Sequence, residues 1–317
     1  MNGTTVRLVL NRLGVAVLTL LAVSLVIFTI TNLLPGDAAQ QLLGQDSTPE
    51  LLAALRIKFG LDQPPYLRYL HWLFGLLTGS LGNAMANGLP VAELIGRRLP
   101  NSLMLAAATT AVSVPLALTI GILSAMYRGS LFDRIVNVAT VWTVSVPEFL
   151  IATVAVLIFA VKLRWLSALS RTDDIATLGQ FLKAYAMPVM TLCCAVSAQM
   201  ARMTRAAVID QLNLSYIEMA RLKGVRPIRM VLTHALPNAI GPIVNAVALS
   251  LAYLIGGVII VESIFNYPGI ASLMVDSVAM RDIPVVQACA ILCCAGYLVL
   301  LTLADVCAIL ANPRLRK

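Results

Sequence analysis

Residues 13–34 read LGVAVLTLLAVSLVIFTITNLL and contain no charged side chain. A helix needs about 20 mostly apolar residues to cross the hydrocarbon core of a bilayer. Because lipid offers no partner to a backbone amide, such a run is stable there only when its amides are paired within the protein. It is also too long for the apolar part of a signal peptide. The stretch therefore predicts a retained membrane-spanning helix.

The same pattern returns along the chain. The protein has 317 residues, of which 59% are hydrophobic and only 12% charged, whereas soluble domains are about 45–50% apolar. The short alternating segments typical of a membrane barrel are not visible. We therefore predict an all-α integral membrane protein with six transmembrane helices. The five further apolar runs are residues 99–127, 135–161, 184–201, 235–261 and 285–304.

These runs divide the chain into three expected parts. The polar part between the first two runs contains the helical stretches 49–58 and 66–77, separated by glycines and prolines. We expect it to form a small helical segment on the outer side of the membrane. The parts are 1–34, the cytoplasmic N-terminus and first helix; 35–98, the extracytoplasmic helical segment; and 99–317, the transmembrane core with a loop at 209–237.

Basic residues predict which side of each helix faces the cytoplasm. With a cytoplasmic N-terminus, the cytoplasmic pieces carry more than half of the 23 Lys and Arg residues. The net charge of +8 is therefore attributed to topology, and no nucleic-acid partner is expected. We predict a multi-pass membrane protein with both termini in the cytoplasm. The cytoplasmic pieces are 1–12, 128–134, 202–234 and 314–317.

The longest cytoplasmic connection contains the charged stretch EMARLKGVRPIRMVLTHALPN, residues 218–238. Each charge costs about 2.5–3.5 kcal/mol at the bilayer centre, so this connection stays in water. Gly224 is expected to end one short helix, and Pro227 suits the start of a second. Leu236 and Pro237 are expected to end that piece and to begin the fifth membrane helix. The sequence thus predicts two short helices with a sharp bend.

This stretch resembles the EAA loop of ABC importer permeases, whose pattern is E-A-A, three residues, Gly, nine residues, then I-x-L-P. Here E-M-A occupies 218–220, Gly224 follows at the family spacing, and H-A-L-P occupies 234–237. Met219 replaces the first Ala, and His234 stands where Ile is common. The resemblance implies that the loop is a coupling helix that fits a cleft on a separate ATPase subunit.

Individual roles follow from that resemblance. It implies that Glu218 faces basic groups of the ATPase, that Ala220 permits close approach and that Gly224 supplies the bend. The full expected coupling set is Glu218, Ala220, Arg221, Gly224, Leu236 and Pro237.

The rest of the chain resembles the dipeptide/oligopeptide/nickel permease family. The motifs that carry this resemblance are LLPGD (33–37), FGLDQPPYLRYLHWL (59–73), GSLG (79–82), VAELIGRRLPNSL (91–103), VESIFNYPGI (261–270), RDIPVVQ (281–287) and the NPRLR tail. They are specific for the family and not for a substrate. Dipeptides and oligopeptides are the leading expectation, with nickel complexes and glutathione also carried by similar permeases.

The resemblance implies a transport subunit that is not itself an enzyme. The chain has no G-x-x-x-x-G-K-[ST] sequence, the phosphate-binding loop of many ATPases. ATP and Mg²⁺ are therefore expected in two partner ATPase subunits, and no cofactor is expected in this chain. A second homologous permease, an extracytoplasmic solute-binding protein and the lipid bilayer complete the expected partners. The alternative is a secondary transporter driven by an ion gradient, which would need paired carboxylates or interrupted helices at repeated positions.

Three polar residues are candidates for the substrate path. Glu148 follows Pro147 within the third apolar run, and an ionisable group inside a span is a functional candidate. A contact with a substrate amine would suit a peptide importer. In the other interpretation, Pro147 kinks the helix near the outer surface, and Glu148 snorkels to the interface or is hydrogen-bonded. Asn245 and Ser250 in the fifth run are candidates for facing a wet cavity.

Overall fold

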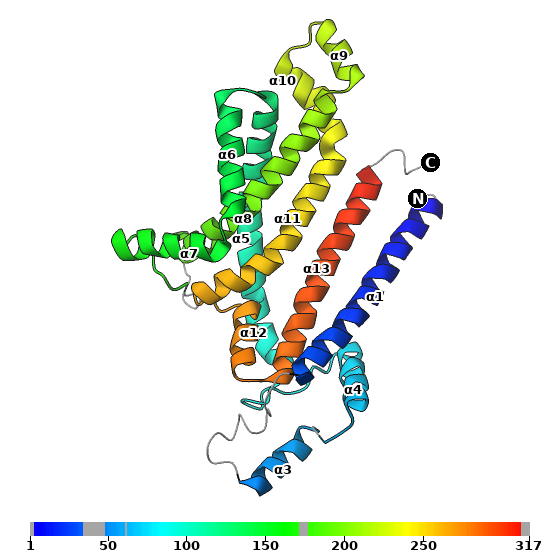
Figure 1. Ribbon diagram of the computed structural model, residues 1–317, viewed down its shortest axis with the longest axis vertical. Coiled ribbons are helices and arrows are strands. Elements are labelled where there is room, and N and C mark those ends of the chain that lie inside the picture. The colour runs from blue at the N-terminus through cyan, green and yellow to red at the C-terminus, as the bar shows by residue number, and fades with distance from the viewer. Residues whose placement is uncertain (1–2, 34–47, 61, 171–176, 312–317) are drawn as a thin grey trace. The chain divides into compact units, whose positions relative to one another are not determined.

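The computed structural model describes residues 3–33, 48–60, 62–170 and 177–311. Throughout these residues the regular elements are helices, with a single isolated bridge between Asn83 and Pro90. Figure 1 shows their order from blue to red. The bounds are α1 Gly3–Leu33, α3 Pro49–Lys58, α4 Pro65–Thr78, α5 Val91–Met126, α6 Leu131–Ser145, α7 Glu148–Ala155, η2 Val156–Lys162, α8 Leu178–Leu212, α9 Ser215–Leu222, α10 Pro227–Arg229, η3 Met230–Ala235, α11 Leu236–Ile264, α12 Ile270–Ala279 and α13 Ile283–Ala311; η marks π-helical turns.

The membrane-spanning pattern is confirmed. Five continuous helices in the described chain have the length and apolarity to cross a bilayer, and one bent pair satisfies the same test when its halves are joined. The continuous spans are Val9–Leu33, Val91–Met126, Leu178–Leu212, Pro227–Ile264 and Ile283–Cys307; the bent pair is Leu131–Ser145 with Glu148–Lys162.

Local sequence signals explain where several helices begin and end. Thr48 caps α3 by accepting a hydrogen bond from the Leu51 amide, and a proline occupies the first turn. Thr177 and Gln180 form a reciprocal capping box at the start of α8, which satisfies amides that have no partner within the helix. At the end of α4, Gly79 adopts φ +79°, a conformation with little steric cost for glycine alone.

The chain divides into two compact units, and each has its own core. Unit 1 comprises Met1–Gly14, Met104–Tyr267 and Tyr297–Lys317. In it α8 packs along α11, α6 packs on α8, and α7 packs on both α8 and α11. Gly121 of α5 lets that helix approach α8 closely, since an added Cβ would lie 2.7 Å from the Ala201 carbonyl oxygen. Gly121 is therefore a position of close contact between α5 and α8.

Unit 2 comprises Val15–Leu103 and Pro268–Gly296. The buried Phe28 ring of α1 packs against Tyr69 of α4, with ring centroids 5.3 Å apart. The Asp282 carboxylate accepts hydrogen bonds of 3.0 Å from the backbone amides of Met85 and Ala86. Buried apolar side chains of α5, α12 and α13 form a core that includes Val91, Ile270 and Val285.

Three expectations about helix bounds need correction. The third span is broken, with α6 and α7 meeting at 99°, because Val146 and Pro147 both adopt extended backbone angles. The second membrane helix begins at Val91 and not at residue 99. No break separates α10 from the fifth span, since π-helical turns join them. Most of the LLPGD motif and the NPRLR tail lie outside the described residues.

Candidate functional site

The connection between α8 and α11 carries the predicted coupling residues. Figure 1 shows α9 and α10 projecting beyond the ends of α8 and α11. Glu218 and Arg221 are exposed on α9, and Ala220 is half-buried. Apolar side chains share this exposed surface, for Met219 is 55% and Leu222 77% exposed. The projecting surface therefore offers both charge and apolar area to a partner.

Gly224 ends α9 as the sequence predicts. It adopts φ +76°, and its amide donates to the Arg221 carbonyl at 2.9 Å. The amide of Val225 donates to the Ala220 carbonyl at 3.1 Å. This pair of bonds is a Schellman motif, which requires the left-handed conformation that glycine adopts most readily. The bend is thus fixed by backbone hydrogen bonds.

A small apolar cluster holds α9 against the start of the fifth span. Ile217 is 1% exposed and packs with Met230 and Ala235 of η3. The Tyr216 hydroxyl lies 3.3 Å from Gln211 Oε1 of α8 and accepts a 3.3 Å hydrogen bond from the Asn238 side chain of α11. Helix α9 is therefore tied to both long helices.

Pro227 begins α10 as predicted, and α11 begins at Leu236 as predicted. The expected end of the shorter piece at Leu236 and Pro237 is wrong, because η3 joins α10 to α11 without a break. The π-helical turns end at Ala235 and the α-helical register resumes at Leu236, which places Pro237 in the first turn of α11. The missing amide of a proline has little cost in a first turn. Leu236 in turn packs against the cluster that joins α8 and α11, which includes Val208, Ile209 and Ile243. The loop is thus mechanically continuous with both helices.

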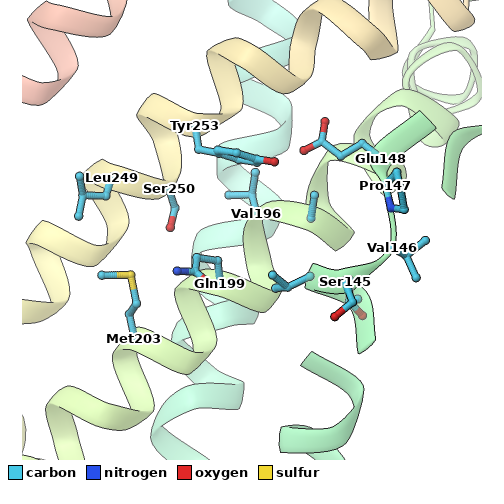
Figure 2. Close-up of a pocket in the computed structure, with 13 residues that line it drawn as sticks. Ser145, Val146, Pro147, Glu148, Val196, Gln199, Met203, Leu249, Ser250 and Tyr253 are labelled. Atoms are coloured by element: carbon cyan, nitrogen blue, oxygen red, sulfur yellow. The ribbon is translucent and has the colours of Figure 1, made fainter. Parts of the chain in front are cut away.

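The second candidate site is a cavity of about 620 Å³ at the break between α6 and α7. Helices α6, α7, α8 and α11 all contribute to its wall, and Figure 2 shows their side chains around it. Its lining residues are Thr143, Val144, Ser145, Val146, Pro147, Glu148, Ala195, Val196, Gln199, Met203, Leu249, Ser250 and Tyr253.

Glu148 is placed in this cavity by the helix break. As the first residue of α7 it is 8% exposed, and its Oε1 has no hydrogen-bond partner within the described chain. Tyr253 reaches toward the carboxylate from α11 (Figure 2). On the same helix Gly257 leaves room for it, since a Cβ there would lie 2.7 Å from Oε2. Glu148 is therefore buried and not snorkelled, while the approach of Tyr253 agrees with the hydrogen-bonded form of the second interpretation.

The structure brings together two of the three residues predicted for the substrate path. Glu148 and Ser250 line the cavity, whereas Asn245 does not. Sequence reasoning missed Gln199 and Tyr253. Tyr253 lies three residues after Ser250, so helical periodicity could have placed both on one face. Gln199 is an uncharged polar residue in an apolar run, which is a weak signal.

Asp305 of α13 forms a 3.1 Å ion pair with Arg12 of α1. Among the described residues there is no cluster of three or more His, Cys, Asp or Glu side chains that could hold a metal ion.

Comparison with known proteins shows which protein family this chain resembles. Residues 117–317 match the family described as binding-protein-dependent transport system inner membrane component. Residues 5–106 match the N-terminal part of such membrane components. A probable peptide ABC transporter permease protein, y4tP of Sinorhizobium fredii, is 32% identical over 97% of this chain and 98% of its own length.

Permeases of glutathione transport systems are similarly related. GsiC of Salmonella choleraesuis is 35% identical, and GsiC of Escherichia coli K12 is 34% identical, each over 97% of this chain and 98% of its own length. These relatives do not favour a secondary transporter. A permease of this kind transports rather than catalyses, resides in the bacterial inner membrane with several spans, and works with ATPase and binding-protein partners. The chain belongs to the family of binding-protein-dependent ABC importer permeases of the peptide type.

Proposed function

We propose that this chain forms half of the translocation pore of an importer for short peptides, with glutathione among the substrates. The names of its relatives, a probable peptide permease and glutathione permeases, support this substrate class. The other half is a second homologous permease. Two ATPase subunits bind ATP and Mg²⁺, and an extracytoplasmic binding protein delivers the solute.

The α9–α10 segment is the proposed docking element for one ATPase subunit. The observation that carries this proposal is the combination of an exposed tip with a rigid base. Glu218, Arg221 and Leu222 are exposed, while Ile217 and the Gly224 turn fix the helix against α11. Closure of the ATPase pair on ATP can therefore displace α8 and α11 together, and so bias the cavity between two states.

The proposed orientation puts both termini and the α9–α10 segment in the cytoplasm. The basic residues of this segment support that orientation, because Arg221, Lys223, Arg226 and Arg229 all lie within it.

Two substitutions test the docking role in the assembled importer. Glu218→Lys reverses the charge on the exposed tip. Gly224→Pro cannot adopt the φ of +76° that the turn requires. Both variants are expected to insert into the membrane at normal levels, yet to lose the coupling of uptake to ATP hydrolysis in proteoliposomes. Unchanged uptake in both variants would refute the docking role.

A further inference from the structure

The cavity at the α6–α7 break has an unusual balance of hydrogen-bonding groups. Three of its hydroxyl groups already donate to their own helices: Thr143 to the Ala139 carbonyl, Ser145 to that of Val141 and Ser250 to that of Ala246, each at 2.8 Å. A hydroxyl oxygen that has donated its hydrogen can still accept. These three hydroxyls therefore offer acceptors to a ligand, whereas Gln199 and Tyr253 carry donors as well.

Glu148 adds a negative charge to these hydroxyl acceptors. It is the sole charged residue among those described as lining the cavity. It is more than nine-tenths buried, and its Oε1 lacks a partner within the described chain. A buried carboxylate is stabilised when a cation or several donors reach it. Tyr253 reaches toward the carboxylate (Figure 2), while Oε1 keeps unused acceptor capacity.

We propose that Glu148 receives the ammonium group of the transported solute as that group passes through the cavity. A primary ammonium carries three N–H donors and one positive charge. It therefore matches the hydroxyl acceptors of the wall and the negative charge of Glu148. The apolar lining, which includes Val196, Met203 and Leu249, would hold the adjoining carbon atoms. This inference rests on the proposed function, since it treats the cavity as part of the solute's path.

The helix break is what makes this position available. In a straight third span, Glu148 would follow Ser145 along one continuous helix. Because Val146 and Pro147 are extended, the first turn of α7 instead directs the carboxylate toward α11. Gly257 leaves room for the carboxylate, since a Cβ at that position would lie 2.7 Å from Oε2. We assign the α6–α7 break to solute recognition for this reason.

A binding experiment on the full chain in lipid nanodiscs tests the proposal without requiring transport. The probes are alaninamide and N-acetylalaninamide, observed by saturation-transfer NMR at about pH 6.5, where an α-amino group is protonated. The wild-type chain is expected to transfer saturation to alaninamide about tenfold more strongly than to the neutral probe. Glu148→Gln should abolish this preference, and Glu148→Asp should retain it in part. Equal transfer to both probes, or a preference unchanged in Glu148→Gln, would overturn the proposal.

Two further arms separate the alternatives. Methylammonium chloride should displace alaninamide at concentrations where sodium chloride does not; equal displacement would identify a general monovalent-cation site and overturn the ammonium assignment. Glu218→Lys should keep the probe preference, because the coupling segment does not line the cavity. If uptake proves independent of the ATPase while the preference persists, the proposed function fails alone. If the preference is absent while coupling is intact, only the ammonium assignment fails.

Discussion

Asp133 shows how a single buried charge can join two membrane helices. The residue is 4% exposed, yet its carboxylate accepts two hydrogen bonds from Arg205 of α8, at 2.7 and 2.9 Å. The Ser124 hydroxyl at 2.5 Å, the Gly129 amide at 2.9 Å and the Asn137 side-chain amide at 2.9 Å also donate to it. Such a carboxylate depends on its partners, because an unpaired buried charge is expensive.

We therefore expect Arg205→Met to lower the free energy of unfolding by on the order of 3 kcal/mol. The double variant Asp133→Asn/Arg205→Met should lose less than the single variant, since no charge is then stranded. Reversible unfolding in mixed micelles measures both. The exposed pair of Arg97 and Glu93 on α5 supplies the control, and Arg97→Met should change stability by less than about 0.5 kcal/mol. A double variant as unstable as Arg205→Met would argue against the pairing account.

Gly121 and Gly256 make a matched pair for helix packing. A Cβ on Gly121 would lie 2.7 Å from the Ala201 carbonyl oxygen and 2.8 Å from Thr204 Cβ, whereas one on Gly256 would meet nothing within 4 Å. Gly121→Ala is expected to destabilise the protein by about 1–3 kcal/mol, because α5 and α8 must separate. Gly256→Ala should be neutral or slightly stabilising in the same unfolding assay. Equal effects would show that α5 and α8 do not meet at Gly121.

At the scale of elements, the packing of α9 against η3 depends mainly on one buried side chain, Ile217. The contribution of this side chain to the local stability of α9 can be measured. Ile217→Ala removes most of the buried side chain that packs on Met230 and Ala235, and leaves the exposed surface of α9 unchanged. Amide hydrogen exchange of α9 is expected to accelerate by about tenfold or more, since a buried Ile→Ala change costs about 2–5 kcal/mol. Leu222→Ala, at a position 77% exposed, should leave the exchange rate close to wild type. Unchanged protection in Ile217→Ala would mean that other contacts hold α9.

Features that depend on neighbouring residues could be predicted from the sequence, whereas features that depend on packing between helices could not. The bounds of α3 and the Gly224 turn were predictable because Thr48, Pro49 and Gly224 act on their immediate neighbours. The sharp α6–α7 break was not, since Pro147 signals only a kink, and the angle depends on how α7 packs against α8 and α11. The π-helical turns of η3 are a change of register within a helix-forming stretch, for which no residue pattern exists.

The cavity was also hard to predict, because four helices build it. Glu148 and Ser250 were identifiable as polar residues in apolar runs. The meeting of Glu148 with Gln199 and Ser250 depends on the α6–α7 break. Asn245 is five residues before Ser250 and therefore lies on another face of α11.

At the scale of the whole molecule, the bent pair decides the topology. Five continuous spans and one bent pair are present in the described chain. If the bent pair crosses the bilayer, the chain crosses six times and the α9–α10 segment lies on the same side as the N-terminus. If the pair enters and leaves on one side, the α9–α10 segment moves to the side opposite the N-terminus. With the proposed cytoplasmic N-terminus, docking of a cytoplasmic ATPase therefore requires that the bent pair cross the bilayer fully, despite its 99° bend.

Single-cysteine labelling distinguishes these two topologies. In a chain whose 6 native cysteines are replaced by serine or alanine, Asp62→Cys and Lys223→Cys introduce thiols at exposed positions. Asp62 lies between α3 and α4, one crossing after the N-terminus, and Lys223 directly follows α9. A membrane-impermeant maleimide added to intact spheroplasts is expected to label Asp62→Cys at once, and Lys223→Cys only after permeabilisation. Labelling of both thiols in intact spheroplasts would show that the bent pair does not cross, and would remove the α9–α10 segment from reach of an ATPase.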